Sequence, residues 1–306
     1  MRRAWRRCGC PKPGGRDCFT ILTLLARETR HIKLGTGIVN VYSRTPAALA
    51  QHFATLDEVS GGRVVIGLGT SGPRVIEHWH GVPFQPSLTR LREYVEILRL
   101  ILAGEPLIYH GRLFRLERGF RLRFTPLRRS IPIFIASLTP KSVAQTARIA
   151  DGWMPVMIPL PQLGQEIAAF RQLVREAGRD PQHVVVRSPG SVTVTRDVER
   201  ARQEAKATLA FYVVRMGDFY REQLRRLGYE REVQAIQEAW ERGGHLAGAA
   251  AVPDALVDNL HFAGPLEACC ERLAAQAEAG VDLHTVRVEG DDPREVRKAY
   301  ERLRGL

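Results

Sequence analysis

Short apolar runs alternate with longer amphipathic stretches along most of this chain. The runs have the length of buried β-strands, and the stretches between them carry apolar positions at helical spacing. We predict strands at residues 31–39, 63–68, 131–136, 153–158, 183–195 and 284–288. We predict helices at residues 19–29, 46–59, 88–102, 141–150, 162–177, 266–279 and from 293 onward. Strands that are apolar throughout and alternate with helices favour a parallel sheet covered on both faces.

Proline and glycine mark the ends of one predicted helix especially clearly. Pro46 follows Thr45 at the helix start, and Gly61 and Gly62 come directly after its last residues. A different pattern occupies residues 105–125, where apolar and polar positions alternate. This alternation predicts a β-hairpin between two of the helix–strand units.

The repeated order of strand and helix favours a (β/α)8 TIM-barrel type of α/β fold over a doubly wound sheet. The glycine fingerprint of dinucleotide-binding sheets is absent, which counts against the second architecture. We count six core strands where a closed barrel has eight, and the shortfall lies before Phe19. We therefore expect a barrel that lacks its first two strands. Residues 1–16 are predicted to be an irregular basic segment, and residues 17–306 the barrel domain, with a helical insertion at 197–260.

Composition narrows the possible partners. Hydrophobic residues make up 44% of the chain and charged residues 25%, as in ordinary globular proteins. The net charge is +12, but the arginines are scattered and no nucleic-acid-binding module accompanies them. No apolar run reaches the length of a membrane span, and no signal-peptide stretch follows the basic start. We expect a cytoplasmic protein that binds neither nucleic acid nor membranes, with part of its charge available to a polyanionic small molecule.

The five cysteines do not predict a disulfide framework or a metal site. Their number is odd, and two of them, Cys269 and Cys270, are adjacent. Cys8, Cys10 and Cys18 are too irregularly spaced to form a common zinc site with a histidine. We expect loose thiols and no bound metal.

Glycine-rich stretches lie at the ends of two predicted strands. Residues 35–40 read GTGIVN, and two glycines near a strand end indicate either a bulge or a plain strand with a kink. Residues 67–72 read GLGTSG. The missing side chains of Gly67 and Gly69 could leave room for a flat ring, to which Thr70 and Ser71 would offer hydroxyl groups. The alternative is a buried strand followed by a tight turn.

Two further stretches carry candidate chemistry. Ser137-Leu138-Thr139-Pro140 lies between a strand and a helix, where a phosphate can bind free N–H groups, or where a hydroxyl simply caps the helix. A second stretch, His78-Trp79-His80, follows the second glycine turn. Histidine can move a proton at neutral pH, but this spacing is poor for a metal site. We predict that these three residues line the rim of a substrate pocket, and we assign the catalytic acid or base to no residue.

Four linked segments resemble the luciferase-like monooxygenase superfamily, and within it the coenzyme F420-dependent branch that contains methylene-tetrahydromethanopterin reductases. They read HIKLGTGIV, TPAALAQHFATLDEVSGGR, VVIGLGTSGPRVIEHWHGVPF and IPIFIASLTPKSVAQTARIADGW. The resemblance implies a barrel with insertions that is usually dimeric. It also implies hydride transfer to or from a flavin or deazaflavin bound at the carboxyl ends of the strands.

The resemblance also implies a non-prolyl cis peptide bond at Gly37–Ile38 and a set of site residues. The implied cofactor-binding residues are Thr36, Gly37, Ile38, Asn40, Gly67, Gly69, Thr70, Ser71, Ser137, Leu138 and Thr139. We expect coenzyme F420 as cofactor, with FMN as the alternative, a small organic substrate, and a homodimer. Two other functions stay open, an FMN-dependent monooxygenase and an inactive barrel remnant that acts only through dimerisation. The inactive remnant is considered because the first two strands, which often supply acid/base groups in relatives, are expected to be missing here.

Overall fold

The strand β4 (Val64–Gly69) is fully buried along its length and forms the middle of a parallel sheet. The computed structural model describes residues 5–7 and 15–303. They divide into two compact units. The first unit contains the residues up to Ala136 together with Ile149–Gly152, and the second contains Ser137–Arg148 and the residues from Trp153 onward.

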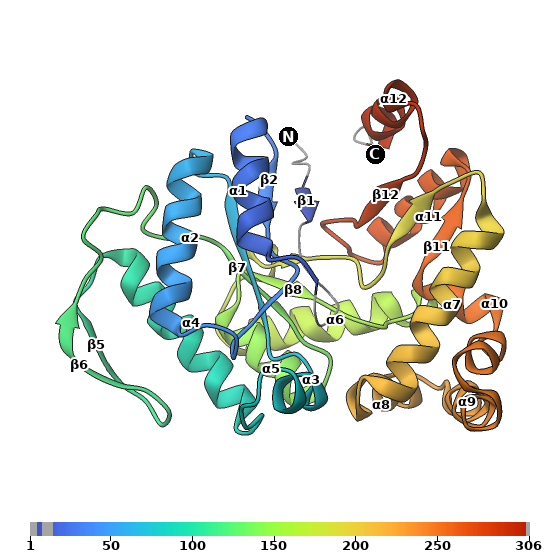
Figure 1. Cartoon of the computed structure of the whole chain (residues 1–306), viewed down its shortest axis with the longest axis horizontal. Coiled ribbons are helices and arrows are strands. Elements are labelled where there is room, and N and C mark those ends of the chain that lie inside the picture. The colour runs from blue at the N-terminus through green and yellow to red at the C-terminus, as the bar shows by residue number, and fades with distance from the viewer. Residues whose placement is uncertain (1–4, 8–14, 304–306) are drawn as a thin grey trace. The chain divides into compact units, whose positions relative to one another are not determined.

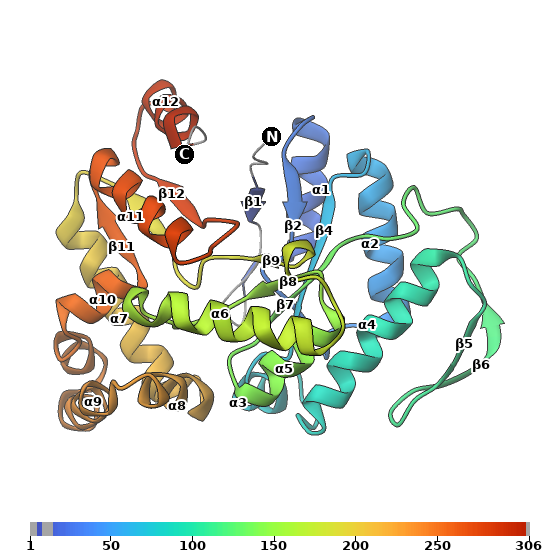
Figure 2. The ribbon, with the colours of Figure 1, turned by 180° about the vertical axis from the view of Figure 1, so that it is seen from behind.

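The sheet of the first unit has the order β1-β2-β4-β7, and all neighbouring strands are parallel (Figures 1 and 2). Its other strands are β1 (Trp5–Arg7), β2 (Lys33–Gly35), β3 (Val39–Asn40), which pairs with β4, and β7 (Ile133–Ala136). Asn40 pairs with Gly69, and Leu68 pairs with Ile135. The carboxyl ends of β3, β4 and β7 therefore meet at one edge of the sheet.

Helices of the first unit pack on this sheet, and α1 and α2 lie side by side (Figure 1). The helices are α1 (Cys18–Glu28), α2 (Pro46–Ser60), α3 (Pro73–His78) and α4 (Ser87–Ala103). The predicted ends of α2 are confirmed, because the Thr45 hydroxyl accepts the N–H of Ala48 and Gly61 is left-handed with φ 65°. The core between helices and sheet contains Leu22, Leu34, Leu49, Phe53, Ile66, Leu68, Leu98 and Ile133.

Two buried charged side chains join these elements at the amino edge of the sheet. The Arg63 guanidinium donates to the carbonyl oxygens of Ala26, Thr29 and Ile32 at 2.8–2.9 Å, so that it caps the end of α1. The carboxylate of Asp57 is 1% exposed and forms a two-point ion pair with Arg128. The connections into β4 and β7 are thereby tied to the end of α2.

The predicted hairpin is confirmed as β5 (Leu107–His110) and β6 (Arg115–Phe120), which are antiparallel. Its turn is held by Glu93 of α4, whose side chain is fully buried. The Glu93 carboxylate accepts the backbone N–H groups of Arg112, Leu113 and Phe114 at 2.7, 3.0 and 3.1 Å. These charge-assisted bonds fix the hairpin to the helix.

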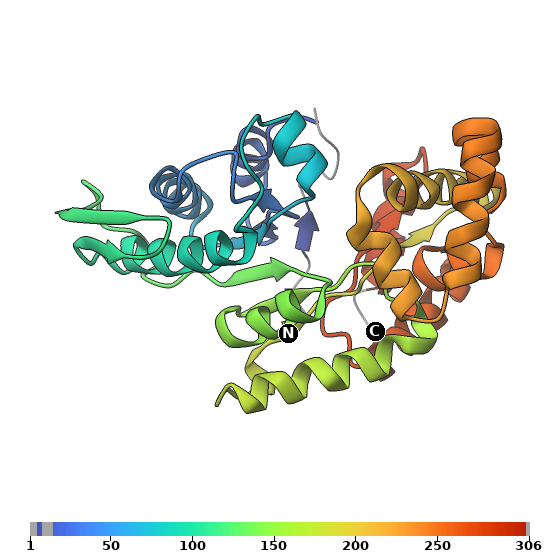
Figure 3. The same cartoon turned by 90° about the horizontal axis from the view of Figure 1, so that it is seen from below.

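The second unit contains a separate parallel sheet with the order β11-β10-β12. Its strands are β10 (Val192–Val194), β11 (Phe262–Gly264) and β12 (Val286–Val288). Its helices are α5 (Pro140–Ile149), α6 (Leu160–Glu176), α7 (Val198–Arg215), α8 (Asp218–Arg226), α9 (Glu230–Ala250), α10 (Asp254–Leu260), α11 (Leu266–Glu278) and α12 (Pro293–Leu303). The helical stretch predicted at 197–260 is α7–α10, in which α7, α8 and α9 pack against one another (Figure 3, gold to orange). Two short strands, β8 (Gly152–Met154) and β9 (Val185–Val186), and a 3-10 helix, η1 (Pro181–His183), complete the described elements.

Several sequence-based boundaries need correction. Trp5–Arg7 is a strand, although residues 1–16 were predicted to be irregular, because it is held by backbone pairing with β2 and has no apolar pattern. The single strand predicted at 31–39 is two strands, β2 and β3, and the one predicted at 183–195 is β9 and β10. The short elements α3 and β11 were not predicted. None of the described helices is long and apolar enough to cross a bilayer.

Candidate functional site

The carboxyl edge of the first unit's sheet is the candidate site. Parallel α/β folds and barrels place their active sites at the carboxyl ends of the strands. Three strand ends meet there, at Asn40, Gly69 and Ala136. The predicted site residues from Thr36 to Ser71 all belong to this unit.

The β2–β3 connection, Thr36–Ile38, is locked onto β4 by one hydroxyl group. The side chain of Thr36 is buried, and its Oγ1 accepts the N–H of Gly67 at 2.8 Å while donating to the carbonyl oxygen of the same residue at 2.8 Å. The Gly37–Ile38 peptide bond is cis, which confirms the prediction. Gly37 and Ile38 themselves are only partly buried. The chain therefore forms a bulge between β2 and β3. Thr36 fixes this bulge to β4, while Gly37 and Ile38 stay partly exposed.

The role predicted for Gly67 and Gly69 needs a correction. A Cβ atom on Gly67 would lie 2.0 Å from the carbonyl oxygen of Thr36, and one on Gly69 would lie 3.1 Å from Cδ1 of Ile38. The space beside both glycines is thus filled by the β2–β3 connection and not left for a ring. The glycines admit the bulge, and a ligand at this edge would meet the bulge itself.

Thr70 and Ser71 continue the edge beyond β4. Ser71 has φ 59°, a left-handed conformation that is uncommon for residues other than glycine and is often found at ligand sites. The Thr70 hydroxyl donates to the carbonyl oxygen of Ser71 at 3.2 Å. Both side chains are half-buried, and Gly72 separates them from the start of α3 at Pro73.

Asn40 organises the end of β3. Its Oδ1 accepts the N–H groups of Tyr42 and Ser43 at 3.0 and 2.8 Å, which fixes the turn after the strand. Its Nδ2 lies 3.3 Å from Nε2 of His80. Because the amide nitrogen is a donor, this arrangement leaves the proton of a neutral His80 on Nδ1.

Of His78, Trp79 and His80, it is His80 that contacts another predicted site residue, Asn40. His78 ends α3 and is exposed, and the Trp79 side chain is 62% exposed. His80 is half-buried and contacts Asn40. His78 is the last residue of α3, and Trp79 and His80 follow it, where the sequence suggested that all three lie on a loop.

Sequence reasoning missed an aromatic and cationic cluster next to this edge. The Arg90 guanidinium carbon lies 4.8 Å from the centre of the Tyr42 ring. The Tyr42 hydroxyl donates to the carbonyl oxygen of Phe84, and that of Tyr94 donates to the carbonyl oxygen of Arg44. Burial raises the pKa of Tyr42 to about 12, despite the opposing effect of Arg90. The only sequence signal was an aromatic residue just past a strand end.

In the second unit, Thr139 caps α5. Its Oγ1 accepts the N–H of Ser142 at 3.3 Å, which confirms that one of the two hydroxyl residues is a cap. The Ser137 side chain is 3% exposed and forms a hydrogen bond with Thr146 Oγ1 at 2.8 Å, so it serves the packing of this unit. Leu138 and Thr139 are half-buried.

Comparison with known proteins bears on this arrangement. Residues 5–283 match the family described as luciferase-like monooxygenase. A Mycobacterium tuberculosis protein named as a coenzyme F420-dependent oxidoreductase is 32% identical over 289 residues, which is 89% of this chain and 83% of that protein. A 5,10-methylenetetrahydromethanopterin reductase from Archaeoglobus fulgidus is 31% identical over 274 residues, or 87% of this chain and 80% of that protein.

A solved structure extends the comparison to the fold. The coenzyme F420-dependent tetrahydromethanopterin reductase from Methanopyrus kandleri superposes with a TM-score of 0.81 at 24% identity, over 97% of this chain and 88% of that one. This likeness confirms the predicted luciferase-like TIM-barrel type of fold. With a family match over most of its length, the chain belongs to the luciferase-like monooxygenase family.

Proposed function

We propose that this chain is a coenzyme F420-dependent oxidoreductase that transfers a hydride to or from a small organic substrate. The observation that supports this most is the β2–β3 connection, which Thr36 fixes onto Gly67 at the carboxyl edge of the sheet. The names of the relatives from Mycobacterium tuberculosis and Archaeoglobus fulgidus support the choice of redox chemistry.

The chemistry of the edge suits a flat ring with polar margins. The partly exposed Gly37 and Ile38 offer a surface of backbone and apolar side chain. Asn40, Thr70 and Ser71 add amide and hydroxyl groups. A deazaflavin ring has carbonyl and N–H groups that match such donors and acceptors. These residues therefore fit the cofactor.

The residues of the chain would hold the cofactor and orient the substrate, and the cofactor would supply the redox chemistry. When bound, the deazaflavin accepts or donates the hydride. The rigid Thr36–Ile38 connection would fix the position of the ring, and Asn40 would hold His80 near it through their contact. We propose that His80, with His78 and Trp79, borders the substrate, while the acid or base for proton transfer stays unassigned.

The remaining predicted contacts are part of the same proposal. Thr139 lies at the start of α5, where backbone N–H groups and the helix dipole favour a phosphate. Ser137 and Leu138 precede it in sequence, and Ser137 would act through the backbone because its hydroxyl is already bonded to Thr146. A homodimer and a cytoplasmic location stay predictions.

A binding experiment separates F420 from FMN, the cofactor of the alternative monooxygenase function. We expect oxidised F420 to co-elute with the purified chain in gel filtration, and FMN to elute separately. Reduced FMN should give no oxygen consumption with the chain. Co-elution of FMN alone, together with oxygen consumption, would replace our proposal by the monooxygenase. Retention of neither cofactor would favour the inactive remnant.

A further inference from the structure

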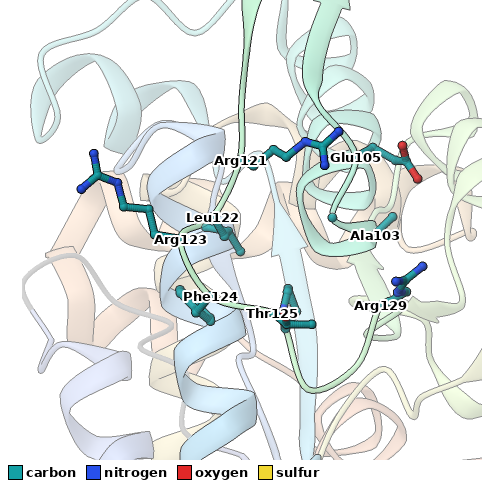
Figure 4. Close-up of a pocket in the computed structure, with 10 residues that line it drawn as sticks. Ala103, Glu105, Arg121, Leu122, Arg123, Phe124, Thr125 and Arg129 are labelled. Carbon is teal, nitrogen blue, oxygen red and sulfur yellow. The ribbon is translucent and has the colours of Figure 1, made fainter.

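A pocket of about 530 Å³ lies in the first unit, away from the candidate site (Figure 4). It is bounded by the end of α4 at Ala103–Glu105 and by the segment 121–129, which runs from β6 toward β7. This segment precedes the amino end of β7, and its residue Arg128 bonds to the first residue of β4, Val64. The pocket is therefore at the amino edge of the sheet, whereas the candidate site is at the carboxyl edge.

Three arginines line this pocket, and each of them is exposed: Arg121, Arg123 and Arg129. None of the three forms an ion pair with any side chain of residues 15–303. Arg128, in the same segment, differs because it is paired with the buried Asp57. In Figure 4, Arg121 and Arg129 extend on the side of Glu105, and Arg123 extends on the other side of the segment.

The negative groups at the pocket are fewer than the positive ones. Glu105 is the acidic residue among those that line it. The end of α4 also carries carbonyl oxygens that would disfavour an anion, and two of them are bonded: Gly104 and Glu105 donate their N–H groups to Ile101 and Leu100 at 3.1 and 3.2 Å. Arg121 and Arg129 extend on the side of Glu105, so two guanidinium groups stand against one carboxylate and leave an excess of positive charge.

The size and lining of the pocket indicate the class of ligand. A volume of this order is typical of small-molecule sites and is too small for a folded partner. Guanidinium groups match phosphate oxygens with two parallel hydrogen bonds. Because Arg121 and Arg129 extend on the same side of the segment, a short chain of linked phosphates would contact both of them. Leu122 and Phe124, which is 37% exposed, add apolar surface for an organic part.

We propose that this pocket binds a small molecule with an oligophosphate chain. The site is separate from the proposed cofactor site, and it gives a role to part of the chain's +12 charge. Inorganic oligophosphate and a nucleoside triphosphate both carry the phosphate chain that the arginines would bind. Only the nucleoside triphosphate also has a base, which Phe124 would contact.

Calorimetric titration of the full chain with sodium tripolyphosphate and with ATP tests the proposal. The double variant Arg121→Gln/Arg129→Gln should lower the affinity for both ligands at least about tenfold, since each ligand loses charge-assisted hydrogen bonds. The matched control, Arg112→Gln/Arg118→Gln, removes two exposed arginines of the neighbouring hairpin that do not line the pocket. It should bind within about threefold of the unmodified chain, because only long-range attraction is lost.

Phe124→Ala separates the two sources of the phosphate chain. A loss of ATP binding with unchanged tripolyphosphate binding would identify a nucleotide, and unchanged binding of both would identify the inorganic chain. No measurable heat with either ligand would overturn the proposal. Equal weakening by the two double variants would also overturn it, because the binding would then follow net charge and not the pocket. Citrate binding as tightly as tripolyphosphate would overturn the assignment to phosphate.

Discussion

We expect Gly67→Ala to destabilise the folded chain by about 3 kcal/mol and to abolish the binding of coenzyme F420. The added Cβ would lie 2.0 Å from the Thr36 carbonyl oxygen and 2.9 Å from its carbonyl carbon. These are backbone atoms, which cannot turn aside as a flexible side chain can. The β2–β3 connection would have to move off β4, and both hydrogen bonds of the Thr36 hydroxyl to Gly67 would be lost. Denaturant unfolding and F420 titration measure the two effects.

Two other glycine variants control for the effect of an added methyl group. Gly69→Ala brings the Cβ to 3.1 Å from the end of the Ile38 side chain, which can shift, so we expect a loss of about 1 kcal/mol and weakened binding. Gly164→Ala in α6 meets no heavy atom closer than 3.9 Å, so it should be neutral or stabilising by about 0.5–1 kcal/mol. A Gly67→Ala chain as stable as the unmodified one would show that the connection is not held as described.

Asp57→Asn should cost about 3 kcal/mol of stability while leaving F420 affinity nearly unchanged in the folded chain. The Asp57 carboxylate is buried, receives the N–H of Val64 at 3.2 Å, and pairs with an Arg128 side chain that is 27% exposed. Its neutralisation leaves that guanidinium without a counter-charge in a partly buried place. Because Arg128 keeps some contact with water, the expected loss lies at the lower end of the range for broken buried pairs.

A double-mutant cycle isolates this ion pair. Arg128→Gln alone should destabilise the chain, and the double variant Asp57→Asn/Arg128→Gln should lose less than the sum of the two single changes. Strict additivity in denaturant unfolding would mean that the pair contributes nothing beyond its separate side chains. A large loss of F420 affinity in Asp57→Asn would mean that the amino edge of the sheet also controls the site.

Features with local signals could be predicted from the sequence. The ends of α2 depend on Thr45, Pro46 and Gly61, which act through their own backbone conformations. The β5–β6 hairpin was visible as alternation in the sequence, and β5 has a more buried and a more exposed face. The cis bond at Gly37–Ile38 came from resemblance alone, since no local pattern of residues specifies it.

Features that depend on distant partners could not be predicted. A glycine such as Gly67 shows that something approaches the backbone closely, but not whether it is a ligand or, as here, Thr36 from another strand. Nothing in the local sequence of Arg63 shows that it caps α1, because its acceptors lie 31–37 residues away. The strand β1 was missed for the same reason, since pairing with β2 defines it.

A crystal structure of the chain with oxidised coenzyme F420 tests the central claim most directly. We predict that the deazaflavin ring lies against the Thr36–Ile38 connection, with polar contacts from Asn40 and from Thr70 or Ser71. A ring bound elsewhere in the chain, with this edge covered by the protein's own side chains, would contradict the account.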